Sequence, residues 1–235
     1  MALILNIETA TEICSVALSN EHGLVDFREN TEGMLHASLL TVFVDDILKK
    51  NNVLPKQLDA IAVSAGPGSY TGLRIGVSVS KGLCYGINKP LISVSTMQSM
   101  AYGFINQLSE NKRDEYSQAW LCPMIDARRL EVYTAFFDSK GEFQSEVTAT
   151  IIDETSYNQI FKTRKVIFFG NGSDKCKEII KNEDALFVSG FTSSARDMIK
   201  LSQQNYDGQN FKDVAYFEPY YLKEFVATTP KNKVF

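Results

Sequence analysis

The stretch of sequence that decides the fold is Ser64-Ala-Gly-Pro-Gly-Ser-Tyr-Thr-Gly-Leu-Arg-Ile-Gly76. The apolar run at 61–65 has the continuous hydrophobic character of a strand at the centre of a sheet. The glycines that follow permit a tight turn, and Ser69 is a suitable N-cap for a helix over residues 70–86. A buried strand, a glycine turn and a helix in this order indicate an α/β protein.

The start of that helix has two interpretations. Free N–H groups and the helix dipole favour an anion there, and Arg74, about one turn inside, would add positive charge. We therefore expect an anion or nucleotide close to Ser69, Tyr70, Thr71 and Arg74. The alternative is a turn that merely lets the strand and the helix pack closely. It is not a Walker phosphate loop, because no Lys-Ser or Lys-Thr follows the last glycine.

Two helices carry features that one interface would explain. Apolar residues cover far more of the helix predicted at 35–50 than the ~100° stripe that a surface helix needs. Glycines spaced by four in the helix at 70–86 would let another helix approach closely. Helix 35–50 is either sandwiched within its own domain or presents a second apolar face to a partner chain. For the second case we predict these contact residues: Leu35, His36, Leu39, Leu40, Phe43, Gly72, Ile75, Gly76, Val79 and Leu83.

The remaining pattern divides the chain into two similar halves. The first half is expected to contain strands at 3–8, 13–19 and 24–29 as an antiparallel meander, then helix 35–50, strand 61–65, helix 70–86, strand 91–94 and a helix from Ser95. The polar stretch 109–117 predicts a boundary, giving subdomains 1–108 and 109–235, with the C-terminal segment as a candidate to pack back on the first.

The second half repeats the order of three strands, helix, strand, glycine turn and helix. The predicted strands are WLCPMI (120–125), EVYTAFF (131–137), FQSEVTA (143–149) and KVIFF (165–169), and the predicted helices lie near 154–163 and begin near Ser173 and Ser194.

Composition excludes several classes of protein. The chain has 235 residues and a net charge of -4, whereas a protein that grips RNA alone usually carries a basic field. The densest basic cluster is Lys162, Arg164 and Lys165. The N-terminus does not resemble a signal peptide, and no apolar run approaches the ~20 residues that span a bilayer. Four cysteines without a CxxC pair indicate free thiols, so we expect a cytoplasmic protein without membrane contact.

The candidate catalytic groups are few. The two histidines, His22 and His36, do not have the spacing of a metal pair, so we predict no metal site and no catalytic residue. His22 lies in a predicted turn, and His36 is expected at the surface or in an interface. Glu8 and Asp126 each end the first strand of their half. A carboxylate there, with Thr9 beside Glu8, either holds a metal-bound water or phosphate or caps local N–H groups.

Three motifs together are similar to one family. The opening ILNIETATEICSVAL, the block SAGPGSYTGLRIGVSVSKGL and the late EPYYLKEF resemble TsaB (YeaZ), a family that acts in synthesis of N6-threonylcarbamoyladenosine at position 37 of tRNA. This resemblance implies the actin/Hsp70/sugar-kinase (ASKHA) fold of two duplicated subdomains, each a mixed sheet flanked by helices. The family commonly has Asp at the end of the first strand, where this chain has Glu8.

The resemblance also implies partners. The paralogue TsaD carries a histidine-ligated metal and transfers the threonylcarbamoyl group, and this chain lacks such a histidine pair. We therefore expect a non-catalytic subunit that binds and activates TsaD, with the ATPase TsaE joining them and tRNA bound only as part of the complex. We expect no cofactor of its own, with a nucleotide at the subunit junction left open, and a homodimer as a candidate state when alone. The alternative is an independent ATPase or phosphotransferase of the same fold.

Overall fold

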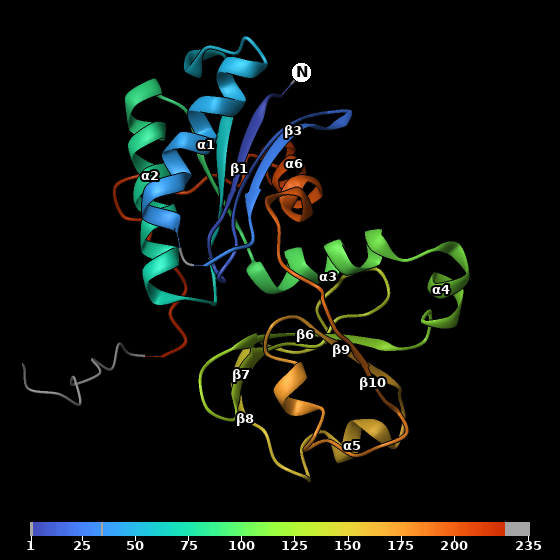
Figure 1. Ribbon diagram of the computed structural model, residues 1–235. Coiled ribbons are helices and arrows are strands. Elements are labelled where there is room, and N and C mark those ends of the chain that lie inside the picture. The colour runs from blue at the N-terminus through green and yellow to red at the C-terminus, as the bar shows by residue number, and fades with distance from the viewer. Residues whose placement is uncertain (1, 34, 224–235) are drawn as a thin grey trace, which may run out of the picture.

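The computed structural model describes residues 2–33 and 35–223 and contains two five-stranded sheets in two subdomains (Figure 1). These sheets, with helices against them, confirm the predicted α/β class. The last two residues of the EPYYLKEF motif, Glu224 and Phe225, lie outside the described residues. No helix of the described chain is long and apolar enough to cross a membrane.

The first sheet has the strand order β3-β2-β1-β4-β5. The predicted meander is confirmed, because β1 pairs antiparallel with β2 and β2 pairs antiparallel with β3. β4 and β5 then add in parallel, so that β1 and β4 lie at the centre of the sheet. The strands are β1 (Ile4–Glu8), β2 (Cys14–Asn20), β3 (Gly23–Asn30), β4 (Ala60–Ser64) and β5 (Leu91–Val94).

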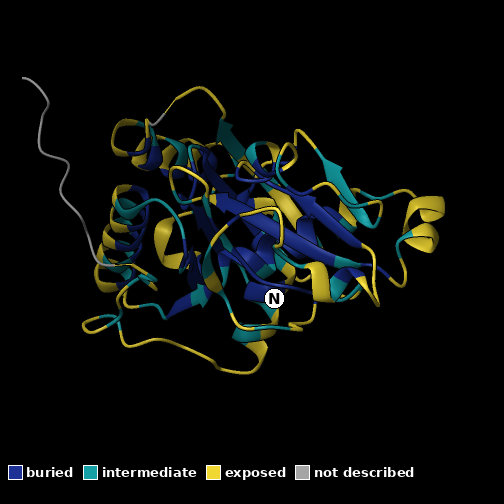
Figure 2. Ribbon diagram, turned by 90° about the horizontal axis from the view of Figure 1, so that it is seen from below, coloured by how far each residue is buried: buried dark blue, intermediate teal, exposed yellow. Residues whose placement is uncertain are grey.

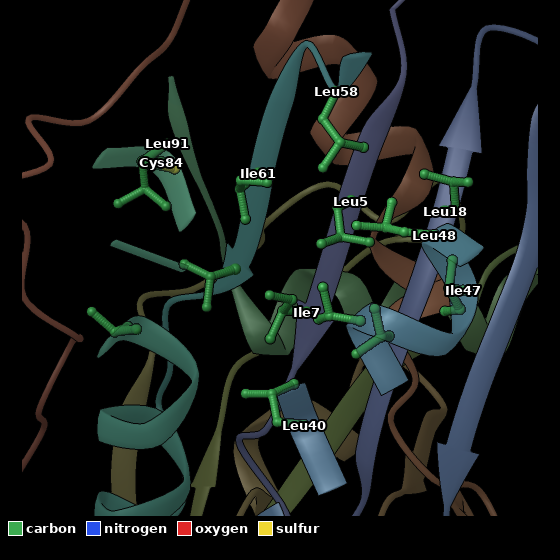
Figure 3. Packing of buried hydrophobic residues seen from close by; sticks show 14 of the residues in the cluster. Leu5, Ile7, Leu18, Leu40, Ile47, Leu48, Leu58, Ile61, Cys84 and Leu91 are labelled. Carbon is green, nitrogen blue, oxygen red and sulfur yellow. The ribbon is translucent and has the colours of Figure 1, made fainter. Parts of the chain in front are cut away.

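Helices α1 (His36–Lys50) and α2 (Tyr70–Ile87) cover one face of this sheet (Figure 1). Side chains alternate along a strand, so Leu5 and Ile7 of β1 face these helices together with Ile61 of β4. They pack against Leu40 and Ile47 of α1 (Figure 3). The 3-10 turn η1 (Pro55–Gln57) links α1 to β4.

Helix α3 (Thr96–Gln107) lies between the two sheets (Figure 1). Its Tyr102 packs with the opposite face of the first sheet, whereas Met100 and Phe104 pack against the second sheet. The 3-10 turn η3 (Ala195–Met198) and helix α6 (Ile199–Asp207) complete the cover on the first sheet. Figure 2 shows buried residues concentrated in the strands and exposed residues in loops and on outer helices.

The second sheet repeats the first. Its order is β10-β9-β6-β7-β8, in which β6 to β8 form an antiparallel meander and β9 and β10 add in parallel on the other side of β6. This is the connectivity of the first sheet, which confirms the predicted duplication. The strands are β6 (Trp120–Asp126), β7 (Glu131–Thr134), β8 (Thr148–Ile151), β9 (Val166–Phe169) and β10 (Ala185–Val188).

Several predictions for the second half were wrong in detail. The third strand lies at β8 rather than at 143–149, and β10 was not predicted. The helix expected at 154–163 is only α5 (Asn158–Phe161), because Asp153 accepts hydrogen bonds from Thr155 and Ser156 and forms a turn before it. The helix expected from Ser173 is the 3-10 turn η2 (Asp174–Cys176), and the polar stretch 109–117 contains a short helix, α4 (Glu110–Glu115).

After the second sheet the chain returns to the first subdomain. The Lys212 N–H donates to Leu91 O of β5 at 2.8 Å, and the Tyr220 N–H donates to Ala65 O at 2.7 Å. Lys81 of α2 donates through Nζ to Ala215 O and Phe217 O. Segment 212–223, in red in Figure 1, therefore runs along α2 and packs on the first subdomain.

Candidate functional site

The glycine block after β4 packs against the turn between β1 and β2. A Cβ on Gly68 would overlap Ala10 O, and a Cβ on Gly72 would overlap Thr9 O. A Cβ on Gly76 would overlap the Thr9 hydroxyl. Glycine is required at these positions because another backbone lies where a side chain would be. Close packing of strand, turn and helix, one of the two interpretations of this block, is therefore present.

The prediction that Gly72 and Gly76 invite a partner helix was wrong. Both residues are buried, and their neighbour is Thr9 of the same chain. Gly82, further along α2, differs, because a Cβ there would meet nothing within 4 Å. The sequence contains the same residue type in both places, so only the three-dimensional neighbours distinguish them.

The start of α2 is capped by its own residues. Ser69 Oγ accepts a hydrogen bond from Gly72 N at 3.2 Å, and the Ser69 N–H donates to Ala10 O at 2.6 Å. Thr71 and Arg74 are exposed. The Arg74 guanidinium lies 4.3 Å from the Tyr70 ring centre and donates through Nε to Tyr221 Oη at 3.3 Å. These two partners are uncharged, but the carboxylate of Glu218 also acts on Arg74, and the predicted anion contact stays a prediction.

Glu8 is fully buried at the end of β1. Its Oε1 accepts a hydrogen bond from Ala10 N at 2.6 Å. Burial removes water from the carboxylate and raises the pKa of Glu8 to about 7, although hydrogen bonds to the charged form act in the opposite direction. Thr9 is buried beside it. These two residues therefore lie inside the first subdomain rather than on a surface that a ligand reaches.

Asp126, the matching carboxylate of the second half, is also engaged. It forms an ion pair with Lys175, and its Oδ1 accepts a hydrogen bond from Arg128 N at 2.8 Å. Both strand-end carboxylates thus cap local N–H groups, which is the second of the two interpretations. Because Glu8 is desolvated and Asp126 is neutralised, these residues do not fit a metal–phosphate group held between the two strand ends.

Polar side chains join the two subdomains directly. Asn171 Nδ2 donates to Glu12 Oε2 at 2.5 Å, and the hydroxyls of Thr11 and Ser193 lie 2.9 Å apart. Within the first subdomain, where η3 covers the sheet, the Ala195 N–H donates to Ser15 Oγ at 2.6 Å. The Gly170-Asn171-Gly172 turn therefore contacts the β1–β2 turn of its own chain rather than standing open.

The two histidines serve no common site. His22 is exposed, as predicted for a turn. His36 was expected at the surface or in an interface, but it is 2% exposed and its Nε2 lies 3.1 Å from Ile13 O. The polar atom of its ring finds a partner inside the subdomain, which explains its burial at the start of α1. Across residues 2–33 and 35–223 no group of three His, Cys, Asp or Glu side chains could hold a metal ion.

The predicted partner-contact residues divide into buried and accessible ones. Leu40 is 1% exposed and belongs to the core, so its inclusion, like that of His36, Gly72 and Gly76, was wrong. Leu35 and Val42 of α1 are each 48% exposed. We define the α1–α2 surface as these two together with five half-buried residues, namely Leu39, Phe43, Ile75, Val79 and Leu83.

A hollow of about 880 Å³, which no sequence pattern predicts, lies at the carboxyl ends of β4 and β5. It lies between Gly66 and Ser95 of the first subdomain and Phe143 and Val147 of the second, with Tyr220 at its rim. Its lining comes from segments that are far apart in the sequence, so only knowledge of which segments lie together could have predicted it.

Comparisons with known proteins agree with this architecture. A family model described as "TsaD: tRNA N6-adenosine threonylcarbamoyltransferase" matches residues 32–231. The chain is 30% identical to the tRNA threonylcarbamoyladenosine biosynthesis protein TsaB of Escherichia coli over 95% of this chain and 96% of that protein. The corresponding Bacillus subtilis protein is 28% identical over 82% of this chain and 80% of its own length.

Solved structures share the fold. YeaZ from Pseudomonas aeruginosa superposes with a TM-score of 0.79 at 24% identity, covering 94% of this chain and 100% of that one. An activator of 2-hydroxyisocaproyl-CoA dehydratase from Clostridium difficile, with bound ADPNP, superposes with a TM-score of 0.51 at 6% identity, covering 88% of this chain and 97% of that one. Two sheets of equal connectivity around α3 define a protein of the two-subdomain ASKHA class. Within that class, the chain belongs to the TsaB (YeaZ) family and takes part in tRNA threonylcarbamoyladenosine biosynthesis.

Proposed function

We propose that this chain is a non-catalytic, cytoplasmic subunit that binds the TsaD-type transferase and makes it active in threonylcarbamoyl transfer to adenosine of tRNA. TsaE joins this pair, and tRNA binds to the assembly. The isolated chain carries no cofactor, and it pairs with a second copy of itself when the transferase is absent.

The observation that carries this proposal is the α1–α2 surface. Leu35 and Val42 leave half of their side chains in water on a helix whose other face is buried in the core. Leaving apolar area of this kind in water costs about 25 cal/mol per Å², and a partner that covers the area removes this free-energy cost. A transferase of the same fold has helices in the corresponding place, so the two surfaces would meet about a pseudo-two-fold axis.

The state of the chain's own strand ends supports a non-catalytic role. Glu8 is buried and Asp126 is paired with Lys175, so neither carboxylate is free to act on a substrate. His36 is buried, and its Nε2 lies 3.1 Å from Ile13 O. The chemistry then belongs to the transferase, and this chain contributes binding surface.

A reconstituted assay tests the proposal. The transferase subunit of the same organism, a threonylcarbamoyl donor and unmodified tRNA are combined with and without this chain, and labelled threonine in tRNA is counted. We expect product formation to fall to background without the chain. Equal product without it would contradict the proposal. Steady-state ATP hydrolysis by the isolated chain would instead favour an independent enzyme.

A further inference from the structure

The hairpin between β6 and β7 carries two consecutive arginines in an unfavourable backbone conformation. Arg128 has φ 73° and Arg129 has φ 52°, in the left-handed region that favours Gly and Asn. The hairpin closes through Ala127 N to Glu131 O at 3.0 Å and Glu131 N to Arg128 O at 3.2 Å. Arginine contributes nothing to such a turn that Asn or Gly would not supply with less strain. Strain of this kind points to a function for the side chains.

The charges around this hairpin leave both guanidiniums available. Asp126 is neutralised by Lys175, and Glu131 is neutralised by Lys223. Arg128 and Arg129 are exposed, and neither forms an ion pair with any residue in the described part of the chain. The acidic side chains next to the arginines are thus already paired with lysines, and the hairpin presents two unneutralised cations in a chain of net charge -4.

A third exposed arginine, Arg74, is linked to this hairpin through segment 221–223. Lys223, which contacts Glu131, is two residues after Tyr221, a separation of at most about 7 Å. Tyr221 holds Arg74 through its hydroxyl and lies 5.1 Å from the Tyr70 ring, centre to centre. Segment 221–223 therefore connects an exposed arginine with two tyrosine rings to the arginine hairpin, although Glu218 also lies close to Arg74.

Arginines and aromatic rings arranged along one surface match the chemistry of RNA. A guanidinium donates two parallel hydrogen bonds to a phosphate, and tyrosine rings stack on unpaired bases. An acidic protein surface could form ion pairs with the same arginines, but it offers no bases to stack on the two tyrosine rings. We propose that Arg128 and Arg129, extended by Arg74 and Tyr70, form a contact for the phosphate backbone of the tRNA that the assembly modifies. This inference rests on the proposed function, which supplies the RNA.

The test replaces the two arginines by Asn, because Asn tolerates the left-handed region and so keeps the hairpin. The Arg128→Asn/Arg129→Asn variant, assembled with the transferase, is titrated with unmodified tRNA at several salt concentrations. Losing two phosphate contacts should weaken binding roughly tenfold and reduce the slope of log affinity against log salt by about 1 to 2. The matched control is Lys162→Asn/Lys165→Asn, which also removes two exposed cations, from the turn before β9.

Co-elution with the transferase is measured separately for each variant, so that a failure of assembly is not mistaken for a loss of RNA contact. The same titration on the isolated chain, at low salt, asks whether the arginine dependence persists without the transferase. The inference is supported if the arginine variant loses tRNA affinity while its melting temperature and its co-elution are unchanged. It is overturned if both variants bind tRNA equally, or if the arginine variant loses the transferase instead, because the hairpin would then be a protein contact.

Discussion

Gly76 of α2 and Thr9 of the β1–β2 turn lie so close that the Thr9 hydroxyl occupies the place of a Gly76 side chain. This contact fixes the start of α2 against the end of β1, where Glu8 is buried. The glycine block at 66–76 therefore serves close packing within the first subdomain. The surface that we assign to a partner lies on the same helices, directly beside this packed face, where Val79 and Leu83 of α2 are only half-buried.

Two glycine substitutions in α2 should have opposite effects on stability. Gly76→Ala should lower the free energy of unfolding by about 1–3 kcal/mol, because its Cβ overlaps Thr9 and the turn must shift. Gly82→Ala should raise it by roughly 0.5–1 kcal/mol, because the Cβ meets nothing and alanine favours the helix. Urea unfolding of the isolated chain measures both. A destabilised Gly82→Ala together with an unchanged Gly76→Ala would refute this assignment of the close contact.

Replacing the buried carboxyl of Glu8 should change how stability depends on pH. The folded-state pKa of about 7 lies above the reference value of 4.5, so the contribution of Glu8 to the free energy of unfolding falls as the pH rises from about 4.5 to 7 and stays constant above 7. Glu8→Gln removes this cost, and its advantage over the parent chain should grow by about 2.5 kcal/mol between pH 5 and pH 8. Burial is the main cause that raises the pKa of Asp197 to about 7, and the charge of Glu8 adds to it, so Glu8→Gln also removes a small part of the cost of ionising Asp197.

The matched control is Asp153→Asn. Hydrogen bonds from Thr155 and Ser156 lower the pKa of Asp153, so its contribution is lost only as the pH falls below its ordinary range. The difference between this variant and the parent should stay constant from pH 5 to pH 8. Urea unfolding at pH 5 and pH 8 gives the free energy of unfolding of each variant. If the difference between Glu8→Gln and the parent chain is also constant, ionisation of Glu8 does not destabilise the fold and the prediction is wrong.

The first sheet was predictable from sequence because each of its elements has a strong local signal. The central strand at 60–64 is uniformly apolar, and Ser69 and Ser95 both cap the helices they were expected to begin. The second sheet was less predictable. Strand β10 is an apolar run of only four residues, ALFV, which periodicity cannot assign to a strand or a helix. Strand β8 has exposed ends and no clear hydrophobic pattern.

The site was predictable only in outline. The wide apolar coverage of α1 correctly indicated exposed leucine and valine side chains beyond those of the core, but periodicity cannot tell which face has a partner. His36 and Leu40 lie on the core side, and only the packed sheet shows this. The arginine hairpin gave no signal at all, because a left-handed backbone at Arg128 and Arg129 is a property of the fold around them.

The central claim is that the α1–α2 surface binds the transferase, and calorimetric titration of this chain with the transferase subunit of the same organism tests it most directly. Val42→Asp places a charge on the exposed part of that surface, and Ile151→Asp places the same charge on an apolar residue of β8 that is 72% exposed. Circular dichroism confirms that both variants stay folded. We expect Val42→Asp to weaken binding at least tenfold, as a residue near the centre of an interface does, and Ile151→Asp to bind like the parent chain. If folded Val42→Asp binds the transferase as tightly as the parent chain does, the interface lies elsewhere and the account is contradicted.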